Sequence, residues 1–185
     1  MKKSLCLIIF LIFSFFIHQK VYADINMTYL VKDTFIPVNP TKALSTSVLE
    51  EGETVYFIVP SDLWLGEYKI IPKNSIVSAK IAMLKMPVTG INAAMRLETE
   101  QIISPDGRKN SIKGTVTTYK GERQIGGDLT PPASYNKALH PRKGEYYNGV
   151  IAQYVPSGEY EFGQHVTLMP SDILYIILDE DYIPY

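Results

Sequence analysis

The sequence predicts an all-β protein built as a single small β-barrel, or as a sandwich-like closed sheet. From residue 51 onward, short runs rich in β-branched and aromatic residues alternate with glycine and proline turns. No window keeps the 3.6-residue apolar period over the roughly 10 to 12 residues that an ordinary helix needs. About eight short strands in one domain are typical of a sandwich or a barrel. A barrel is favoured because closure removes exposed sheet edges.

The first 23 residues have the three-part layout of a secretory signal. Lys2 and Lys3 precede an apolar or small-residue run at 5–17, and Val21-Tyr22-Ala23 offers a cleavage site. This run is shorter than the roughly 20 residues of a membrane-spanning helix. We therefore expect a cleaved signal peptide at 1–23, with a retained anchor as the alternative. The mature protein is expected in the periplasm or the extracellular envelope.

The mature chain is expected to contain an N-terminal extended arm at 24–50 and one β-barrel domain at 51–185. The arm holds Pro37 and Pro40 and shows little periodicity, and a terminus that nothing ties down usually frays. A mature chain of 162 residues can bury about 70% of its unfolded surface, which is enough for one core.

Eight runs of the barrel domain are predicted strands. They are residues 54–59, 68–71, 75–83, 93–98, 112–116, 150–155, 160–169 and 172–178. The first is apolar almost throughout and suits a strand covered on both faces. In the third, Val77, Ala79 and Ile81 share one face by the period of two, and Lys80 lies on the other.

Two similar segments mark predicted corners of the sheet. Val-Pro-Ser-Asp-Leu at 59–63 recurs as Met-Pro-Ser-Asp-Ile at 169–173, each after a predicted strand. Proline ends ladder pairing, and serine or aspartate side chains can cap the backbone of a turn. Trp64 follows the first corner, where we expect it to cap the core at one end of the barrel.

Residues 52–125 carry turns in an order that resembles a known family. These are Gly-Glu-x-Val-x-Phe at 52–57, Ile-Pro-Lys-Asn-Ser-Ile-Val at 71–77, and Pro-Asp-Gly at 105–107 followed by Ile-Lys-Gly at 112–114. The order is similar to the C-terminal β-barrel domain of the VirB10/TrbI proteins of type IV secretion. Asn74 stands where that family usually has glycine, and asparagine also tolerates the left-handed conformation. The family's inserted helical pair has no apolar counterpart here. The resemblance implies a cell-envelope barrel with assembly-type contacts.

Several chemistries have no basis in the sequence. Cys6, the only cysteine, lies in the signal segment, so the mature chain has no thiol and no thiolate metal site. His140 and His165 lack the spacing of a metal site, and the sequence contains no serine-hydrolase elbow or phosphate-binding loop. Loss of three lysines with the signal leaves 15 basic against 19 acidic residues, which argues against nucleic acid. We expect no enzyme, no cofactor and no metal.

The catalytic alternative is an envelope hydrolase that uses Glu98, Glu100 or His165. Arg96, Glu98 and Glu100 share one strand face by the period of two, and paired carboxylates can hydrolyse glycosides. Charge pairs on a solvent-exposed face are the more common reason for such a pattern.

A long loop is predicted at 126–149, and it carries the candidate binding residues. They are Tyr135, His140, Arg142, Lys143, Tyr146 and Tyr147. Long connections in compact domains are often functional, and tyrosine beside a cation suits a protein interface. The same groups could stack on glycan, or simply pack as a surface loop.

The sequence therefore predicts a non-catalytic secreted or periplasmic protein that acts by protein binding or assembly. Its expected partners are envelope proteins, and contact with a membrane is expected to be peripheral at most. The alternatives are glycan binding, a small ligand held inside the barrel, and the peptidoglycan hydrolase described above.

Overall fold

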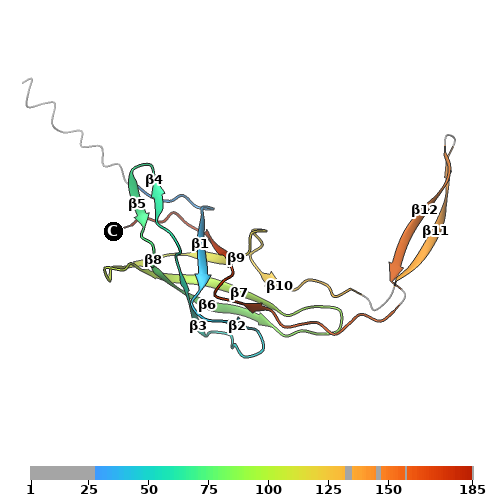
Figure 1. The fold of residues 1–185 in the computed structure, drawn as a ribbon, viewed down its shortest axis with the longest axis horizontal. Helices are drawn as coiled ribbons and strands as arrows, with labels where there is room; N and C mark the ends of the chain where they lie inside the picture. Colours follow the sequence, from blue (N-terminus) through green and yellow to red (C-terminus); the bar gives the residue numbers. More distant parts are fainter. Residues whose placement is uncertain (1–27, 132–134, 145–146, 157, 185) are drawn as a thin grey trace, which may run out of the picture.

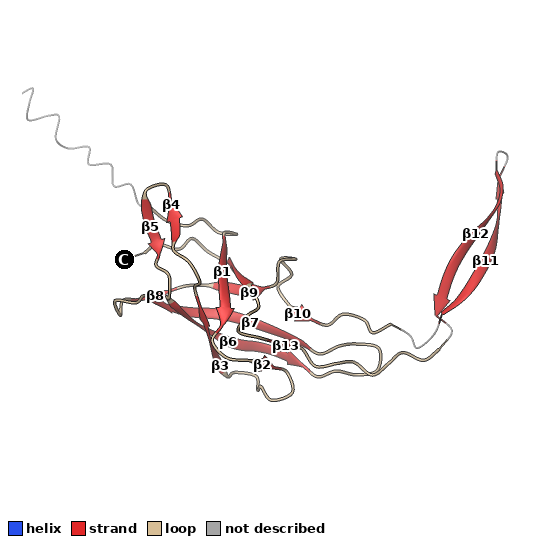
Figure 2. Ribbon diagram, viewed as in Figure 1, coloured by secondary structure: helices blue, strands red, loops and turns tan. Residues whose placement is uncertain are grey.

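The computed structural model describes residues 28–131, 135–144, 147–156 and 158–184, with residues 135–156 described by their backbone. All regular structure in these ranges is β (Figures 1 and 2). No helix in the described part of the chain is long and apolar enough to cross a membrane. The predicted signal peptide, residues 1–23, lies outside the described residues.

Six antiparallel strands close into a barrel. They are β1 (Phe35–Pro40), β3 (Thr54–Ile58), β6 (Ile76–Lys85), β7 (Ala94–Ile103), β9 (Gly114–Thr117) and β14 (Leu174–Leu178). Their order is β7-β6-β3-β1-β14-β9, and the pairing of β9 with β7 completes the ring. Two further strands, β8 (Lys109–Ser111) and β10 (Ile125–Gly126), also pair with β7. The predicted all-β barrel is confirmed.

Six strands lie outside the ring as three pairs. β2 (Leu44–Ser45) pairs with β13 (Thr167–Leu168), β4 (Leu63–Leu65) with β5 (Tyr68–Ile71), and β11 (Tyr135–Gly144) with β12 (Tyr147–Pro156). Figure 1 shows the β4–β5 and β11–β12 hairpins at opposite ends of the long axis. The barrel lies between them.

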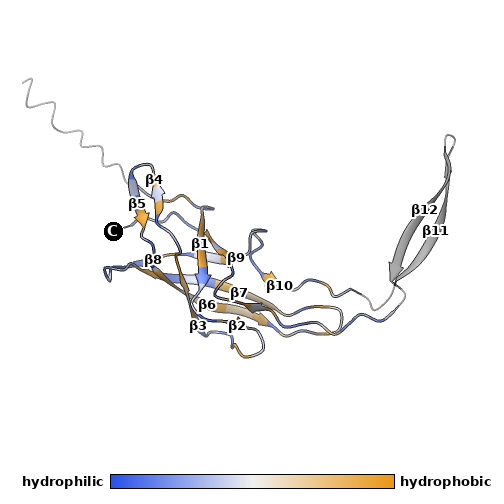
Figure 3. Ribbon diagram, in the orientation of Figure 1, coloured by the Kyte–Doolittle hydropathy of each residue, from blue (hydrophilic) through white to orange (hydrophobic). Residues whose placement is uncertain are grey.

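The core follows the period of two along β1, β3 and much of β6 and β7, whereas β9 is buried at every position. In β6, Val77, Ala79 and Ile81 are buried and Lys80 is exposed, as predicted. In β3, Phe57 is buried but Tyr56 is exposed. The prediction that this strand is covered on both faces was therefore wrong, because in a closed barrel one face of each strand meets the core and the other meets solvent. Figure 3 shows the hydrophobic strand segments and the largely hydrophilic turns.

The N-terminal region is part of the barrel rather than an extended arm over 24–50. Its β1 lies between β3 and β14, pairing with β14 through 35–38 and with β3 through 39–40. Each β1 residue thus pairs with one neighbour at a time. This explains how the strand accommodates Pro37 and Pro40, since proline cannot supply the second ladder bond of a doubly paired position.

Two predicted segments differ from the structure. The loop predicted at 126–149 is largely the β11–β12 hairpin, whose strands run from 135 to 144 and from 147 to 156. The strand predicted at 160–169 is regular only at β13, while Phe162 makes an isolated bridge to Thr89. Gly163 follows at a point of close backbone contact. At this point the segment around Gly163 crosses the segment around Ile91 and does not pair along it.

The turns agree with the sequence predictions more closely than these two segments do. Asn74 has a φ of 65°, so the asparagine in the predicted turn does adopt the left-handed conformation. Both corner aspartates cap backbone N–H groups: Asp62 accepts a hydrogen bond from the Lys73 N–H at 2.6 Å, and Asp172 accepts one from the Met169 N–H at 2.8 Å. The two similar segments therefore form corners, although their caps reach different partners.

The two ends of the described chain are joined beside the barrel. Leu30 and Tyr182 exchange backbone hydrogen bonds of 2.9 and 2.8 Å. The buried Tyr182 hydroxyl accepts a hydrogen bond from the Asn110 side-chain amide at 3.1 Å. Burial raises the pKa of the Tyr182 phenol above its ordinary value of 10.0, because a phenolate would lose its hydration there.

This raised pKa predicts a loss of stability in alkali. The unfolded Tyr182 ionises near pH 10, below the pKa of the folded state, so its contribution is complete below about pH 10 and falls as the pH rises through the folded pKa. Thermal melts between pH 8 and pH 11 should show a steeper fall in Tm for the native chain than for Tyr182→Phe. Parallel curves for the two proteins would contradict this assignment.

Candidate functional site

Three chain segments join at the base of the β11–β12 hairpin, and we call them the stem. The stem consists of residues 86–92, 127–130 and 160–164. Gly90 connects all three, since its N–H donates to the Glu161 carbonyl and its carbonyl accepts from the Thr130 N–H, both at 2.9 Å. The Asn92 N–H donates to the Asp128 carbonyl at 2.9 Å. These bonds fix the stem to the end of the β6–β7 pair.

The stem is tightly packed at Gly163. A Cβ added there would lie 1.9 Å from the Ile91 carbonyl oxygen, a separation no side chain can tolerate. The Gly163 N–H also donates to the Val88 carbonyl at 3.0 Å. Glycine is therefore required where the chain returning from β12 crosses the β6–β7 connection.

The stem and the end of β6 line a hollow of about 630 Å³. Its lining residues are Lys85, Met86, Val88, Ile91, Asn92, Ala94, Gln124 and Gly127. Lys85, Asn92 and Gln124 are the residues with polar side chains in this lining. Asn92 Oδ1 accepts a hydrogen bond from the Gln164 N–H at 2.8 Å, and Gln124 Nε2 donates one to the Gly126 carbonyl at 3.2 Å. A volume of this size falls within the range of roughly 300–1,000 Å³ that is usual for binding pockets.

The stem also exposes large apolar side chains, some of which line this hollow, and we call them the stem patch. The patch consists of Met86, Val88, Ile91, Leu129 and Phe162. Leu129 is 71% exposed and Phe162 is 66% exposed. Backbone bridges join Ile91 to both Val88 and Leu129, and they join Phe162 to Thr89, the residue after Val88. Grouped exposed apolar side chains on a folded protein mark interaction sites more often than single ones do.

The structure places the predicted binding residues on the hairpin beside the stem, apart from Tyr146, which lies outside the described residues. Tyr135, His140, Arg142 and Lys143 belong to β11, and Tyr147 pairs with Gly144 from β12. By the two-residue period, His140, Arg142 and Tyr147 fall on one face of the hairpin. Tyr135 and Lys143 fall on the other. The predicted set is thus divided between two faces.

The stem patch was not predicted from the sequence. Its members come from three segments that are far apart in the chain, and each is a single apolar residue in a turn or an irregular stretch. Single exposed apolar residues are ordinary on protein surfaces. Only the backbone bridges of the folded stem bring these five side chains together.

Two residues of the catalytic alternative, Glu98 and His165, make ordinary structural contacts, and Glu100 is exposed on β7. Arg96 and Glu98 form an exposed ion pair at 3.1 Å, the arrangement expected on a solvent-exposed face. His165 Nδ1 lies 3.1 Å from the Thr46 hydroxyl oxygen. Among the described residues, no group of three or more His, Cys, Asp or Glu side chains is placed to hold a metal ion.

The barrel interior is filled by large apolar side chains. The largest fully buried ones include Ile36, Phe57, Ile81, Met95 and Leu97. A barrel packed in this way leaves its centre to the core, which disfavours the prediction of a small ligand carried inside. The hollow beside the stem is a separate feature at the outside of the barrel.

No protein-family model matches this sequence, and no curated protein matches it. Among solved structures, the chain is similar to ComB10 of the Com Type IV secretion system of Helicobacter pylori, with 14% sequence identity and a TM-score of 0.47. The match covers 86% of this chain and 93% of ComB10.

Proposed function

We propose that this protein is a non-catalytic component of the bacterial cell envelope that binds another envelope protein through the stem patch and the β11–β12 hairpin. The observation that carries the proposal is the stem patch itself. Five large apolar side chains are held in the open by a hydrogen-bonded stem. Keeping such a surface exposed is costly unless a partner covers it.

The hairpin supports the same proposal. β11 and β12 pair with each other and with no other described strand, and an isolated two-stranded hairpin is marginally stable in water. Its outer edges offer backbone donors and acceptors that a partner strand could pair with. A partner that covers the stem patch would therefore also be placed to stabilise the hairpin.

An envelope location and a link to secretion are supported by the sequence. The predicted export signal supports a location outside the cytoplasm, and the turns at 52–125 resemble those of type IV secretion barrels. ComB10, the similar structure, is itself a component of a type IV secretion system. We accordingly propose an assembly role in a secretion-type apparatus.

Site-specific photo-crosslinking in living cells tests the role of the stem patch. A photoreactive residue at Leu129 or Phe162 should form a discrete adduct with an envelope protein, whereas one at Tyr119, which is 81% exposed, should not. The photoreactive residue can also replace Val88, another member of the stem patch. The yield of the adduct formed from this position should fall at least about tenfold in a Leu129→Asp/Phe162→Asp variant, because charges in the patch oppose apolar docking.

The matched control is Tyr119→Asp, which places the same charge on another exposed aromatic position. It should leave the adduct and the Tm unchanged. An adduct that persists in the Leu129→Asp/Phe162→Asp variant would remove the stem patch from the interface. Equal adduct yields from positions 119 and 129 would do the same.

The hollow supports a second candidate, the binding of an envelope glycan fragment. The Asn92 and Gln124 amides line it beside aliphatic surface, and amides can hydrogen-bond to sugar hydroxyls. Soluble peptidoglycan fragments should then protect the native chain in thermal melts and should not protect an Asn92→Ala/Gln124→Ala variant. An unchanged Tm for the native chain would exclude this candidate.

A further inference from the structure

The tip of the β4–β5 hairpin exposes three large side chains. Trp64 is 54% exposed, Leu65 is 45% exposed and Tyr68 is 58% exposed. The prediction that Trp64 caps the barrel core was therefore wrong, because the short hairpin carries this residue out beyond the core. The residues that do close this end of the core are Ile70 and Ile71, both buried.

The tip is held rigidly by polar contacts at its base. The Lys69 ammonium lies 2.8 Å from Asp62 Oδ2 and 5.0 Å from the centre of the Trp64 ring. The hydrogen bond from Lys69, followed by that from the Lys73 N–H, holds the pKa of Asp62 below its usual value. Gly66, with a φ of 61°, makes the tight turn. These contacts join the two strands of the tip and place the Lys69 ammonium over the Trp64 ring.

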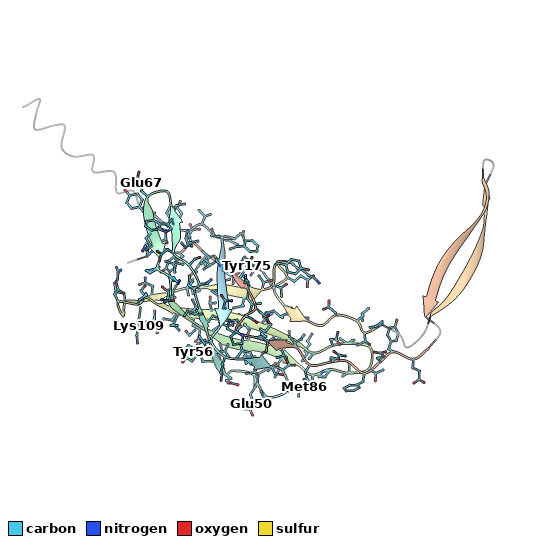
Figure 4. All side chains as sticks on the ribbon, viewed as in Figure 1. Glu50, Tyr56, Glu67, Met86, Lys109 and Tyr175 are labelled. Atoms are coloured by element: carbon cyan, nitrogen blue, oxygen red, sulfur yellow. The ribbon has the colours of Figure 1, made fainter. Side chains whose placement is uncertain are left out.

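This tip lies at the same end of the molecule as the first described residue, Thr28. Figure 1 shows the start of the described chain at the same end of the long axis as β4 and β5, and Figure 4 places Glu67 of the turn there. The apolar run at 5–17 ends ten residues before this point. Ten residues span at most about 35 Å when fully extended.

We propose that the β4–β5 tip inserts into the headgroup interface of a bilayer that holds the N-terminal apolar run, in a chain that keeps this run as an anchor. With the run at 5–17 in the membrane, the end of the barrel that carries Thr28 is held near the bilayer surface. Tryptophan and tyrosine are the residues that favour this interface, where their rings combine apolar area with a polar group. Leu65 adds aliphatic surface at the same tip.

The charges of the hairpin predict how it binds. Asp62 and Glu67 balance Lys69 and Lys73, and the Lys69 charge is already neutralised by Asp62. Contact with the bilayer would therefore come from apolar surface, and it should not require anionic lipid or weaken in salt. This distinguishes it from the electrostatic adsorption of a basic patch.

Trp64 is the only tryptophan of the chain, so its fluorescence reports directly on the tip. The full chain reconstituted into phosphatidylcholine vesicles should emit at shorter wavelength than in detergent-free buffer. It should be quenched by lipids brominated near the headgroup and protected from aqueous acrylamide about threefold or more. Raising the salt to 0.5 M should leave all three readings unchanged. Acrylamide accessibility equal to that in buffer would overturn the proposal.

The matched control moves the single indole to the opposite end of the molecule. In Trp64→Phe/Phe162→Trp, the introduced indole replaces an exposed aromatic side chain of the stem patch, and we expect no quenching by brominated lipid. A further variant, Leu65→Ala/Tyr68→Ala, keeps Trp64 as reporter and should lose most of the quenching. Equal lipid quenching of the native and moved indoles would overturn the proposal, as would unchanged quenching in Leu65→Ala/Tyr68→Ala.

Discussion

Replacing Phe57 with alanine should lower the free energy of unfolding by about 3–5 kcal/mol, the usual cost of removing a buried phenylalanine ring. Phe57 is the largest of the fully buried side chains. It lies on β3, between Pro40 of β1 and Val77 of β6. The surrounding strands are fixed by their ladders and cannot collapse into the space left by the ring. Urea unfolding followed by circular dichroism measures the loss.

The adjacent Tyr56 provides the control for this measurement. It occupies the same strand but is 46% exposed, so Tyr56→Ala should cost less than about 1 kcal/mol. The difference in stability loss between Phe57→Ala and Tyr56→Ala depends only on which face of β3 meets the core. Equal losses for the two variants would show that the barrel interior does not lie on the Phe57 side.

Gly114→Ala should also destabilise the barrel, through steric overlap rather than a cavity. A Cβ at position 114 would lie 2.5 Å from the Ile177 carbonyl oxygen and 2.7 Å from Ile176 Cγ2. Gly114 begins β9, the strand that joins β14 to β7 and completes the ring. The carbonyl cannot retreat without weakening the β9–β14 ladder. We expect a loss of about 1–3 kcal/mol or more.

Amide hydrogen exchange locates this effect. In Gly114→Ala, protection should fall first in β9 and β14, ahead of β3 and β6 on the far side of the ring. Ser111→Ala, an exposed position on β8, should change stability by less than about 0.5 kcal/mol. Uniform protection in Gly114→Ala, with native stability, would contradict the close approach of these two strands.

Most of the ring could be predicted from the sequence because its signals are local. Strands β6 and β7 show a period of two within their own residues, β3 is a run of β-branched and aromatic residues, and the turn at Asn74 follows from one residue's conformational preference. Such patterns need no knowledge of distant partners. The predicted runs at 54–59, 75–83 and 93–98 accordingly overlap these strands.

The parts that the sequence analysis missed depend on long-range pairing. β1 contains two prolines, and its strand conformation comes from β14, well over a hundred residues away in the chain. β11 mixes polar and apolar residues around Pro141, and only its register with β12 makes it a strand. The stem patch likewise exists only after three separate segments have met. No local pattern in any of these segments reveals the partner that shapes it.

The position of β1 between β3 and β14 also affects how and when the chain can fold. Phe35, near the start, must find Ile177, near the finish, so no truncated or partly synthesised form can complete the ring. Topologies with such distant pairings nucleate slowly, in milliseconds to seconds. The predicted export signal gives this delay a role, because a chain that cannot close its ring early is easier to transport unfolded.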